Sequence, residues 1–332
     1  MSEKHQICIP IANDIKSKPK TKVTVVGVGS VGMAIAFTVM TKSEANVLAL
    51  IDADENKVKG EVLDMQQGSQ FLDTCNVIGG KDFSYSAHSD VVFIAAGARQ
   101  KDGESRLNLI QRNLEIFKCI VPEIVKHSPN CVIVVVSNPV DILTHITWKL
   151  SGFPQNRVLG SGTVLDSARF RHILGEKLNL AASSIHGYII GEHGDSSVAV
   201  WSKVSIGGVH LATVYPKMGE DDDPDHFADI HKSVVESAYE IIRLKGYTSW
   251  AIGLGCANLC HALVNDRHVV LPVSTNVKGL YGIDYDCFLS IPSVINSSGV
   301  TSVINLSLKP KEIEKLHRSA KTLDDIFKGL KW

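Results

Sequence analysis

Two short runs in the second half of the chain contain the side chains best suited to chemistry: Asp166-Ser-Ala-Arg169 and Gly191-Glu-His193-Gly-Asp195. Histidine can exchange a proton near neutral pH, because its unperturbed pKa is about 6.5. A buried carboxylate such as Asp166 would raise that pKa and fix the ring tautomer. A histidine, a carboxylate and an arginine can together polarise and protonate a carbonyl group.

Asp166 and Arg169 are three positions apart on a predicted helix, so their side chains project from one face. The simplest interpretation is an ion pair within the helix. Arginine can also hold a substrate carboxylate through two parallel charge-assisted hydrogen bonds, each worth about 1.5–3 kcal/mol. Lysine cannot reproduce that geometry. We therefore favour a substrate-binding role for Arg169.

A polar segment between residues 97 and 106 follows a strand that ends at Ala95, where ligands bind in open α/β sheets. The segment could close over a substrate, exclude water and bring Arg106 to a carbonyl oxygen on which charge develops. Its other interpretation is a solvated surface loop. Asn138 follows the next strand and is similarly placed to donate a hydrogen bond to a cofactor or a substrate.

The glycine run Gly27-Val-Gly29-Ser-Val-Gly32 comes directly after an apolar strand, which gives this common pattern its weight. Gly27 and Gly29 allow a tight turn and close approach to a pyrophosphate, and Gly32 lets the following helix, residues 33–40, pack on the sheet. The alternative is an ordinary strand-to-helix turn whose glycines only allow packing.

Asp52 ends the second strand about twenty residues after the last glycine, where a carboxylate can accept hydrogen bonds from a ribose diol. A 2′-phosphate would meet like charge there, so NAD is favoured over NADP. Together with His193, Asp166 and Arg169, this site predicts reversible hydride transfer between a nicotinamide and a small carbonyl acid.

The elements that must position these side chains alternate regularly. Near-continuous apolar strands, at 22–26, 47–51, 91–95 and 131–136, are separated by helical stretches, which predicts a buried parallel sheet. After about residue 161 the pattern becomes mixed. We therefore expect an arm (1–20), a Rossmann-type doubly wound α/β domain that binds NAD (21–161), and a mixed α+β catalytic domain (162–332).

Composition narrows the class of protein. The 332-residue chain is 44% hydrophobic and 21% charged, with a net charge of −1, so nothing favours nucleic acid or an anionic membrane as a partner. Seven scattered cysteines and the lack of an apolar signal core in the first twenty residues predict a cytoplasmic protein. Cys256, Cys260 and His261 share a helix face, but we interpret them as packing residues and predict no metal.

Several segments are together much more specific than any one alone. They are G-V-G-S-V-G, A-G-A-R-Q, S-N-P-V-D-I-L, L-D-S-A-R-F-R, G-E-H-G-D-S-S and K-G-Y-T-S-W-A-I-G-L. On these segments the chain resembles the animal-type L-lactate dehydrogenases along essentially its whole length.

The resemblance implies a role for each candidate residue. His193 would be the proton donor and acceptor, Asp166 would orient it, Arg169 would clamp the carboxylate and Arg106 would polarise the ketone. The resemblance further implies contacts from Asn138 and Thr248 beside the substrate, and Arg99 near the cofactor. The implied reaction is the NAD-dependent interconversion of pyruvate and L-lactate.

Gln100 separates this activity from its nearest alternative. The malate dehydrogenases resemble this chain in fold and in their His, Asp and Arg set, but they typically have an arginine at this position. Neutral Gln100 would leave the second carboxylate of oxaloacetate without a counter-charge, a penalty of several kcal/mol or about a thousandfold. Malate dehydrogenase, a broader 2-hydroxyacid dehydrogenase, and a structural protein on a dehydrogenase scaffold stay as alternatives.

Two further expectations rest on the resemblance. Proteins similar to this one are usually homotetramers in which an N-terminal arm reaches a neighbouring subunit, which implies that residues 1–20 form such an arm. Arg171 and His186 correspond to a site where some bacterial relatives bind a sugar bisphosphate. Many unregulated relatives keep similar residues, so we expect any anion effect here to be weak.

Overall fold

The structure is a computed structural model, and it describes residues 21–72, 75–98 and 106–332. The strands are β1 (Lys22–Val26), β2 (Val47–Ile51), β3 (Asn76–Gly80), β4 (Val91–Ile94), β5 (Val132–Val135), β6 (Val158–Gly160), β7 (Ile185–His186), β8 (Ile189–Ile190), β9 (Val198–Ala199), β10 (Ser205–Ile206), β11 (Val209–His210), β12 (Val269–Asn276), β13 (Phe288–Asn296) and β14 (Gly299–Val303). The α-helices are α1 (Ser30–Thr41), α2 (Glu55–Gln67), α3 (Arg106–His127), α4 (Val140–Ser151), α5 (Val164–Leu178), α6 (Leu211–Val214), α7 (Ala228–Lys245), α8 (Trp250–Val264) and α9 (Pro310–Lys328).

The first six strands form a parallel sheet in the order β3-β2-β1-β4-β5-β6. In this order the direction of winding reverses between β1 and β4, which is the point where dinucleotides bind in doubly wound sheets. The predicted Rossmann-type α/β fold is therefore confirmed. The strands β12, β13 and β14 continue the same sheet beyond β6 in antiparallel pairing, so the two halves of the chain share one sheet.

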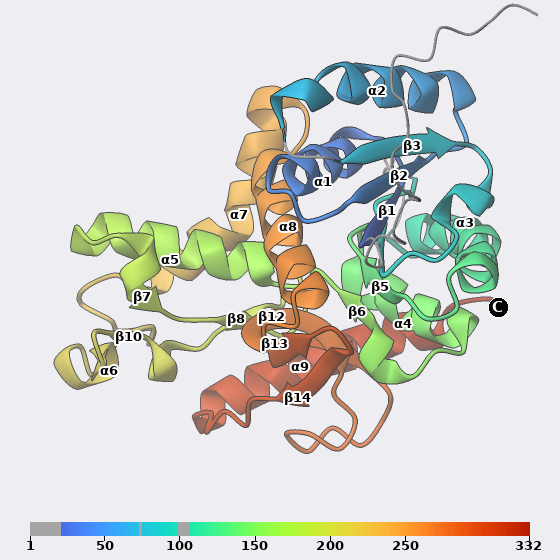
Figure 1. Ribbon diagram of the computed structural model, residues 1–332. Coiled ribbons are helices and arrows are strands. Elements are labelled where there is room, and N and C mark those ends of the chain that lie inside the picture. Colours follow the sequence, from blue (N-terminus) through green and yellow to red (C-terminus); the bar gives the residue numbers. More distant parts are fainter. Residues whose placement is uncertain (1–20, 73–74, 99–105) are drawn as a thin grey trace, which may run out of the picture.

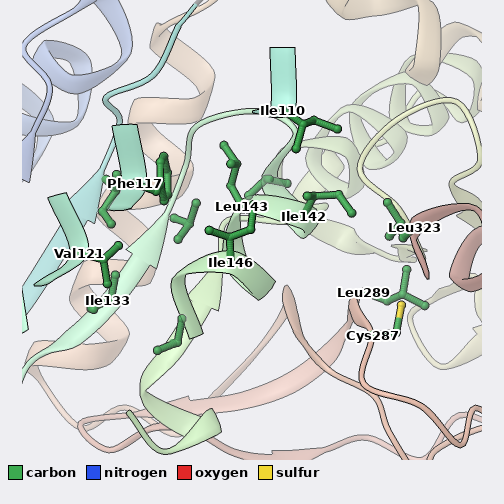
Figure 2. Packing of buried hydrophobic residues seen from close by; sticks show 14 of the residues in the cluster. Ile110, Phe117, Val121, Ile133, Ile142, Leu143, Ile146, Cys287, Leu289 and Leu323 are labelled. Carbon is green, nitrogen blue, oxygen red and sulfur yellow. The ribbon is translucent and has the colours of Figure 1, made fainter. Parts of the chain in front are cut away.

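Helices cover both faces of this sheet, as Figure 1 shows. Side chains alternate along a strand, so each strand contributes to two cores. Val23 of β1 packs in the core that includes α1, α2 and α8, whereas Val26 belongs to the core that includes α3, α4 and α9. Figure 2 shows part of the second core, with Phe117 of α3 and Ile146 of α4 among its labelled residues. Each such side chain stabilises the fold by about 1.5–3 kcal/mol when fully buried.

A third core lies outside the main sheet. Its aromatic centre is Trp201, whose ring centroid is 4.9 Å from that of Phe170 in α5 and 6.3 Å from that of Phe227, next to α7. Ile189 of β8 belongs to the same core. This packing fixes α5, α7 and β8 relative to one another, and these elements carry or flank the candidate catalytic residues.

The described segments contain the helices α1 to α9. Among them, no helix is both long enough and apolar enough to cross a membrane.

Candidate active site and cofactor cradle

The turn after β1 lies at the point where the sheet reverses its winding. Gly27 has a φ of +99°, and a Cβ atom on it would lie 2.5 Å from the backbone nitrogen of Ala96, just beyond β4. Its N–H donates to the carbonyl oxygen of Ile51 at the end of β2, at 2.7 Å. The turn therefore occupies the space between the ends of β2 and β4, and only glycine fits there.

The two other glycines of the run serve different purposes. A Cβ atom on Gly32 would lie 1.8 Å from the carbonyl oxygen of Gly27, so Gly32 is needed for α1 to approach the turn. A Cβ atom on Gly29 would meet nothing within 4 Å and would enter open space at the N-terminus of α1. Gly29 offers no side-chain cap, and the first turn of α1 has no acidic residue. These features fit the pyrophosphate of a dinucleotide.

Asp52 is anchored beside this turn. Its Oδ2 atom accepts a hydrogen bond from the backbone N–H of Val28 at 2.7 Å, and its Oδ1 atom accepts one from Asp54 at 3.0 Å. A carboxylate oxygen has more than one acceptor lone pair, so Asp52 keeps the capacity to bind hydroxyl groups. Its position beside the glycine turn fits the ribose of NAD.

The candidate catalytic residues meet in one cluster. His193 Nδ1 lies 2.5 Å from Asp166 Oδ2, and Arg169 Nη1 donates to Asp166 Oδ1 at 3.3 Å. The side chains of Asp166 and Arg169 are 10% and 11% exposed, and that of His193 is 24% exposed. Because Nδ1 is bound to Asp166, the other ring nitrogen, Nε2, is the one available for proton exchange.

The charges in this cluster determine its protonation. Burial of His193 opposes a charged ring, but the charge of Asp166 and its hydrogen bond outweigh burial and raise the pKa of His193 to about 9. Burial also opposes ionisation of Asp166, yet His193 and then Arg169 hold the pKa of this carboxyl below its usual value. The pair is therefore an ionised carboxylate and a protonated imidazole at neutral pH.

Strand β8 is fixed directly on α5, which places His193 beside Asp166. The hydroxyl of Thr163, just before α5, donates to the carbonyl oxygen of Ile189 at 2.6 Å. The N–H of Ile189 donates to Ser167 Oγ at 3.0 Å. These two bonds hold the strand that leads into the His193 loop against the helix that carries Asp166 and Arg169.

A second buried carboxylate supports the backbone of the loop. Asp141, in the first turn of α4, accepts a hydrogen bond from the N–H of His193 at 2.8 Å through Oδ2 and one from Ser274 at 2.6 Å through Oδ1. Burial raises the pKa of Asp141 to about 6, although both hydrogen bonds and the charge of His193 act in the opposite direction. Asp141 therefore links the loop to α4 and to β12.

The remaining predicted substrate residues are only partly described. Asn138 is exposed beyond the end of β5, and its Oδ1 atom accepts a hydrogen bond from Val140 at 3.3 Å. Thr248 is half-buried between α7 and α8. Arg99 and Gln100 lie outside the described residues, as does the side chain of Arg106, the first residue of α3.

Arg171 and His186 are on neighbouring elements. Arg171 Nε donates to the carbonyl oxygen of Gly187 at 3.0 Å, and its guanidinium lies 5.1 Å from the ring centroid of Tyr188. His186 is exposed on β7. The guanidinium of Arg171 thus has contacts within the chain that an anion would have to share.

Cys256, Cys260 and His261 are all in α8, but their surroundings differ. Cys256 and Cys260 are buried in the core, whereas His261 Nδ1 lies 2.9 Å from Glu44 Oε2. Across the described parts of the chain, no group of three or more His, Cys, Asp or Glu side chains could hold a metal ion.

Sequence reasoning did not assign roles to several polar residues that build the site. They are Asp141, Thr163, Ser167, Ser274, Ser290 and Ser319. For Asp141 a signal existed, because a lone carboxylate within the mainly apolar segment 140–146 must find partners when buried. The serines and the threonine gave no such signal, since their partners are far away in the sequence.

Comparison with known proteins agrees with this geometry. Residues 21–160 match the family model described as lactate/malate dehydrogenase, NAD binding domain. Residues 163–331 match the model described as lactate/malate dehydrogenase, alpha/beta C-terminal domain. The chain therefore belongs to the lactate/malate dehydrogenase family, and its first half is an NAD-binding domain.

Its relatives within this family include L-lactate dehydrogenase chains. It is 55% identical over 328 residues to the L-lactate dehydrogenase B chain of Homo sapiens, an alignment that covers 99% of this chain and 98% of the relative. It is 56% identical over 330 residues to the A chain of Sphyraena idiastes, with 99% of each chain covered. It is 54% identical to the A chain of Columba livia over the full length of both. The resemblance to the L-lactate dehydrogenases is confirmed.

Proposed function

We propose that this chain is an NAD-dependent L-lactate dehydrogenase that interconverts pyruvate and L-lactate. One observation carries the proposal: the His193, Asp166 and Arg169 side chains form one cluster in a chain that also has the glycine turn and Asp52 of an NAD-binding domain. The relatives named above bear the name L-lactate dehydrogenase, and their alignments cover 99% or more of this chain.

His193 moves the proton of the reaction. In pyruvate reduction, the protonated ring donates its Nε2 proton to the ketone oxygen, and in lactate oxidation the neutral ring accepts the hydroxyl proton. Asp166, whose Oδ2 atom lies 2.5 Å from Nδ1, orients and stabilises the charged ring. NADH, when bound, supplies the hydride that the ketone carbon receives.

Arginine side chains bind the charged and polar parts of the substrate. Arg169 is at the edge of the cluster, where its guanidinium can bind the substrate carboxylate through two parallel hydrogen bonds. We assign Arg106 to the ketone oxygen, where its charge stabilises the negative charge of the transition state. Asn138 and Thr248 complete the substrate site.

The cofactor site combines three backbone features with one carboxylate. Gly27, Gly29 and Gly32 bring the N-terminus of α1 to the pyrophosphate, and Asp52 binds the ribose diol. Arg99 and Asn138 are assigned to contacts with the same cofactor.

Gln100 is proposed to select pyruvate over oxaloacetate, because an uncharged side chain leaves a second substrate carboxylate unpaired. The variant Gln100→Arg is expected to raise kcat/KM for oxaloacetate and to lower it for pyruvate. An unchanged ratio of the two kcat/KM values would remove Gln100 from this role.

We propose that the chain forms a homotetramer. Several large apolar side chains are exposed on α1, α2, α7 and α8, and contacts between subunits would cover them. They include Phe37 of α1, Leu63 of α2, Tyr239 and Leu244 of α7, and Trp250 and Leu254 of α8. The arm, residues 1–20, is assigned to a contact between subunits.

Two further assignments belong to this proposal. We divide the chain into an NAD-binding domain (21–161) and a catalytic domain (162–332). We place the protein in the cytoplasm, because the described cysteines (Cys75, Cys119, Cys131, Cys256, Cys260 and Cys287) are free thiols, which fits a reducing compartment.

The direct test compares substrates. Purified protein is mixed with NADH and, in separate reactions, pyruvate, oxaloacetate and a 2-oxoacid with a bulky side chain, and the loss of NADH absorbance is followed. The proposal predicts that pyruvate gives the highest kcat/KM and that the product is L-lactate. A preference for oxaloacetate would favour malate dehydrogenase, and no turnover of any substrate would favour a non-enzymatic scaffold.

A further inference from the structure

The loop 191–197, which joins β8 to β9 and carries His193, is held by an unusually varied set of elements. The backbone N–H groups of three successive loop residues, Gly191, Glu192 and His193, each donate a hydrogen bond to a different element. The acceptors are Ser290 O in β13 at 2.9 Å, Ser319 Oγ in α9 at 2.7 Å and Asp141 Oδ2 in α4 at 2.8 Å. The position of His193 therefore depends on elements that are distant from it in the sequence.

Ser319 is the contact that the C-terminal helix makes with this loop. Its side chain is fully buried, and its Oγ atom accepts the N–H of Glu192, the residue before His193. A Cβ atom on Gly191 would lie 3.1 Å from the same Oγ atom, so the hydroxyl packs closely on the loop. A buried N–H needs an acceptor, and here α9 provides it.

Ser319 also bonds to the other side of the loop. Its Oγ atom is 3.1 Å from Ser196 Oγ, and the Ser196 hydroxyl in turn donates to the carboxylate of Glu192. The Ser196 hydroxyl is therefore within hydrogen-bond distance of both Ser319 Oγ and the Glu192 carboxylate. The hydrogen bonds form a closed ring through Glu192, Ser196 and Ser319.

In the sequence, two members of this ring flank His193. Glu192 precedes His193 directly and Ser196 follows three positions later, so both sides of the loop are tied to one atom of α9. Glu192 is 1% exposed, and hydrogen bonds in such a dry environment are stronger than in water.

We propose that Ser319 is a positioning residue for the proton transfer by His193, and that it couples the C-terminal helix α9 to the catalytic loop. It acts through the loop backbone, which must keep Nδ1 at 2.5 Å from Asp166 and Nε2 directed at the substrate. The inference rests on the proposed function.

The test compares Ser319→Ala with Thr322→Ala as a matched control. Thr322 is on the same helix, and its hydroxyl bonds to the carbonyl oxygen of Arg318 within that helix. Ser319→Ala is expected to lower kcat for pyruvate reduction about tenfold or more, because small displacements of a reacting group are costly. Its KM for pyruvate and its affinity for NADH should stay within about twofold of wild type, because the displaced group transfers a proton and holds neither ligand.

A second readout separates positioning from loss of stability. When the His193 and Asp166 geometry loosens, the pH at which kcat falls should move to lower pH in Ser319→Ala and stay in place in Thr322→Ala. Ser196→Ala removes another member of the ring and should also lower kcat. In the double variant the two losses should be less than multiplicative, because both act through Glu192.

Each outcome decides the question. If Ser319→Ala has wild-type kcat and pH profile, the proposal is overturned. If Ser319→Ala fails to fold, Ser196→Ala decides alone, and wild-type kcat in that variant overturns the proposal. If wild-type protein does not reduce pyruvate at all, the proposed function fails, which is distinguishable from failure of this inference because the latter requires an active parent enzyme.

Discussion

At the scale of single residues, the distance of 2.5 Å between His193 Nδ1 and Asp166 Oδ2 determines which protonation state is present. The pKa of His193 is raised to about 9, so its ring is protonated at neutral pH and ready to donate. The sign of the effect on stability follows. The stabilisation from this pair is fully present below the unfolded pKa of about 6.5 and is lost as pH rises through about 9.

Asp166→Asn should therefore impair catalysis without preventing folding. Without the carboxylate charge, the pKa of His193 moves down towards its ordinary value, and kcat for pyruvate reduction at neutral pH falls about a hundredfold or more. The decline of kcat/KM for pyruvate with rising pH should also begin at lower pH than in wild type. Steady-state kinetics across a pH series measure both effects.

Asp195→Asn is the matched control for that experiment, because Asp195 is an exposed carboxylate in the same loop. Its pH profile should match that of wild type. If Asp166→Asn and Asp195→Asn have the same profile, Asp166 does not set the pKa of His193.

Arg169→Lys tests the proposed carboxylate clamp. Lysine keeps the charge but makes one point contact in place of two parallel hydrogen bonds, a loss of about 1.5–3 kcal/mol. The KM for pyruvate should rise about tenfold to a hundredfold, as measured by initial rates at saturating NADH.

Arg171→Lys is the control for the clamp, since Arg171 is on the same helix and its guanidinium bonds to the carbonyl oxygen of Gly187. Its KM for pyruvate should stay near the wild-type value. An equal rise in KM for both variants would mean that Arg169 does not bind the substrate directly.

At the scale of elements, the turn from β1 to α1 contains one glycine that the packing of the helix requires, Gly32, and one that only the cofactor requires, Gly29. A Cβ atom on Gly32 would collide with the carbonyl oxygen of Gly27, at 1.8 Å, whereas one on Gly29 would meet no protein atom within 4 Å. Gly29 has a φ of −74°, which alanine adopts without strain. Substitution by alanine is therefore expected to have different effects at the two positions.

Gly29→Ala should weaken NADH binding while Tm stays near the wild-type value, because its methyl group enters the space assigned to the pyrophosphate. Gly32→Ala should lower both Tm and NADH affinity, because α1 must move away from the turn. NADH titration by fluorescence and thermal unfolding of the two variants measure this difference. Wild-type NADH affinity in Gly29→Ala would place the pyrophosphate elsewhere.

At the scale of the whole molecule, the strands of the parallel sheet were predicted well wherever the sequence has a continuous apolar pattern. The strands expected at 22–26 and 47–51 match β1 and β2, and those expected at 91–95 and 131–136 match β4 and β5 to within a residue at each end. Their continuous apolar pattern reflects burial on both faces of a parallel sheet. The clustering of His193 with Asp166 was also expected, and the structure shows it.

What the sequence did not predict depends on contacts between distant residues. β3 contains Gly79 and Gly80, which weaken a strand pattern, and the continuation of the sheet through β12 depends on pairing of Ser274 with Gly160. The ring through Ser319 joins residues more than a hundred positions apart. A serine gives no local indication of a partner at such a distance.

The proposed homotetramer can be tested by substituting apolar side chains that are exposed on the helices. Helix α8 packs beside α1, as Figure 1 shows, and Trp250 on α8 is 64% exposed. A homotetramer should have four times the 36.1-kDa mass of the chain in light scattering. Leu254→Glu should give a smaller species, because it introduces a charge into an apolar contact.

Thr301→Glu, on the exposed edge strand β14, is the control and should keep the wild-type mass. Dissociation in both variants would indicate a general loss of stability. A wild-type protein that is monomeric at micromolar concentration would contradict the tetramer proposal.

The measurement that most directly tests the central claim is NADH oxidation with pyruvate by wild-type protein and by His193→Ala, together with NADH titration of both. The account predicts rapid formation of L-lactate by wild type, a loss of kcat of about a hundredfold or more in His193→Ala, and retained NADH affinity in that variant. Wild-type turnover by His193→Ala would contradict the assignment of the proton donor, and absence of pyruvate reduction by the wild-type protein would contradict the proposed activity itself.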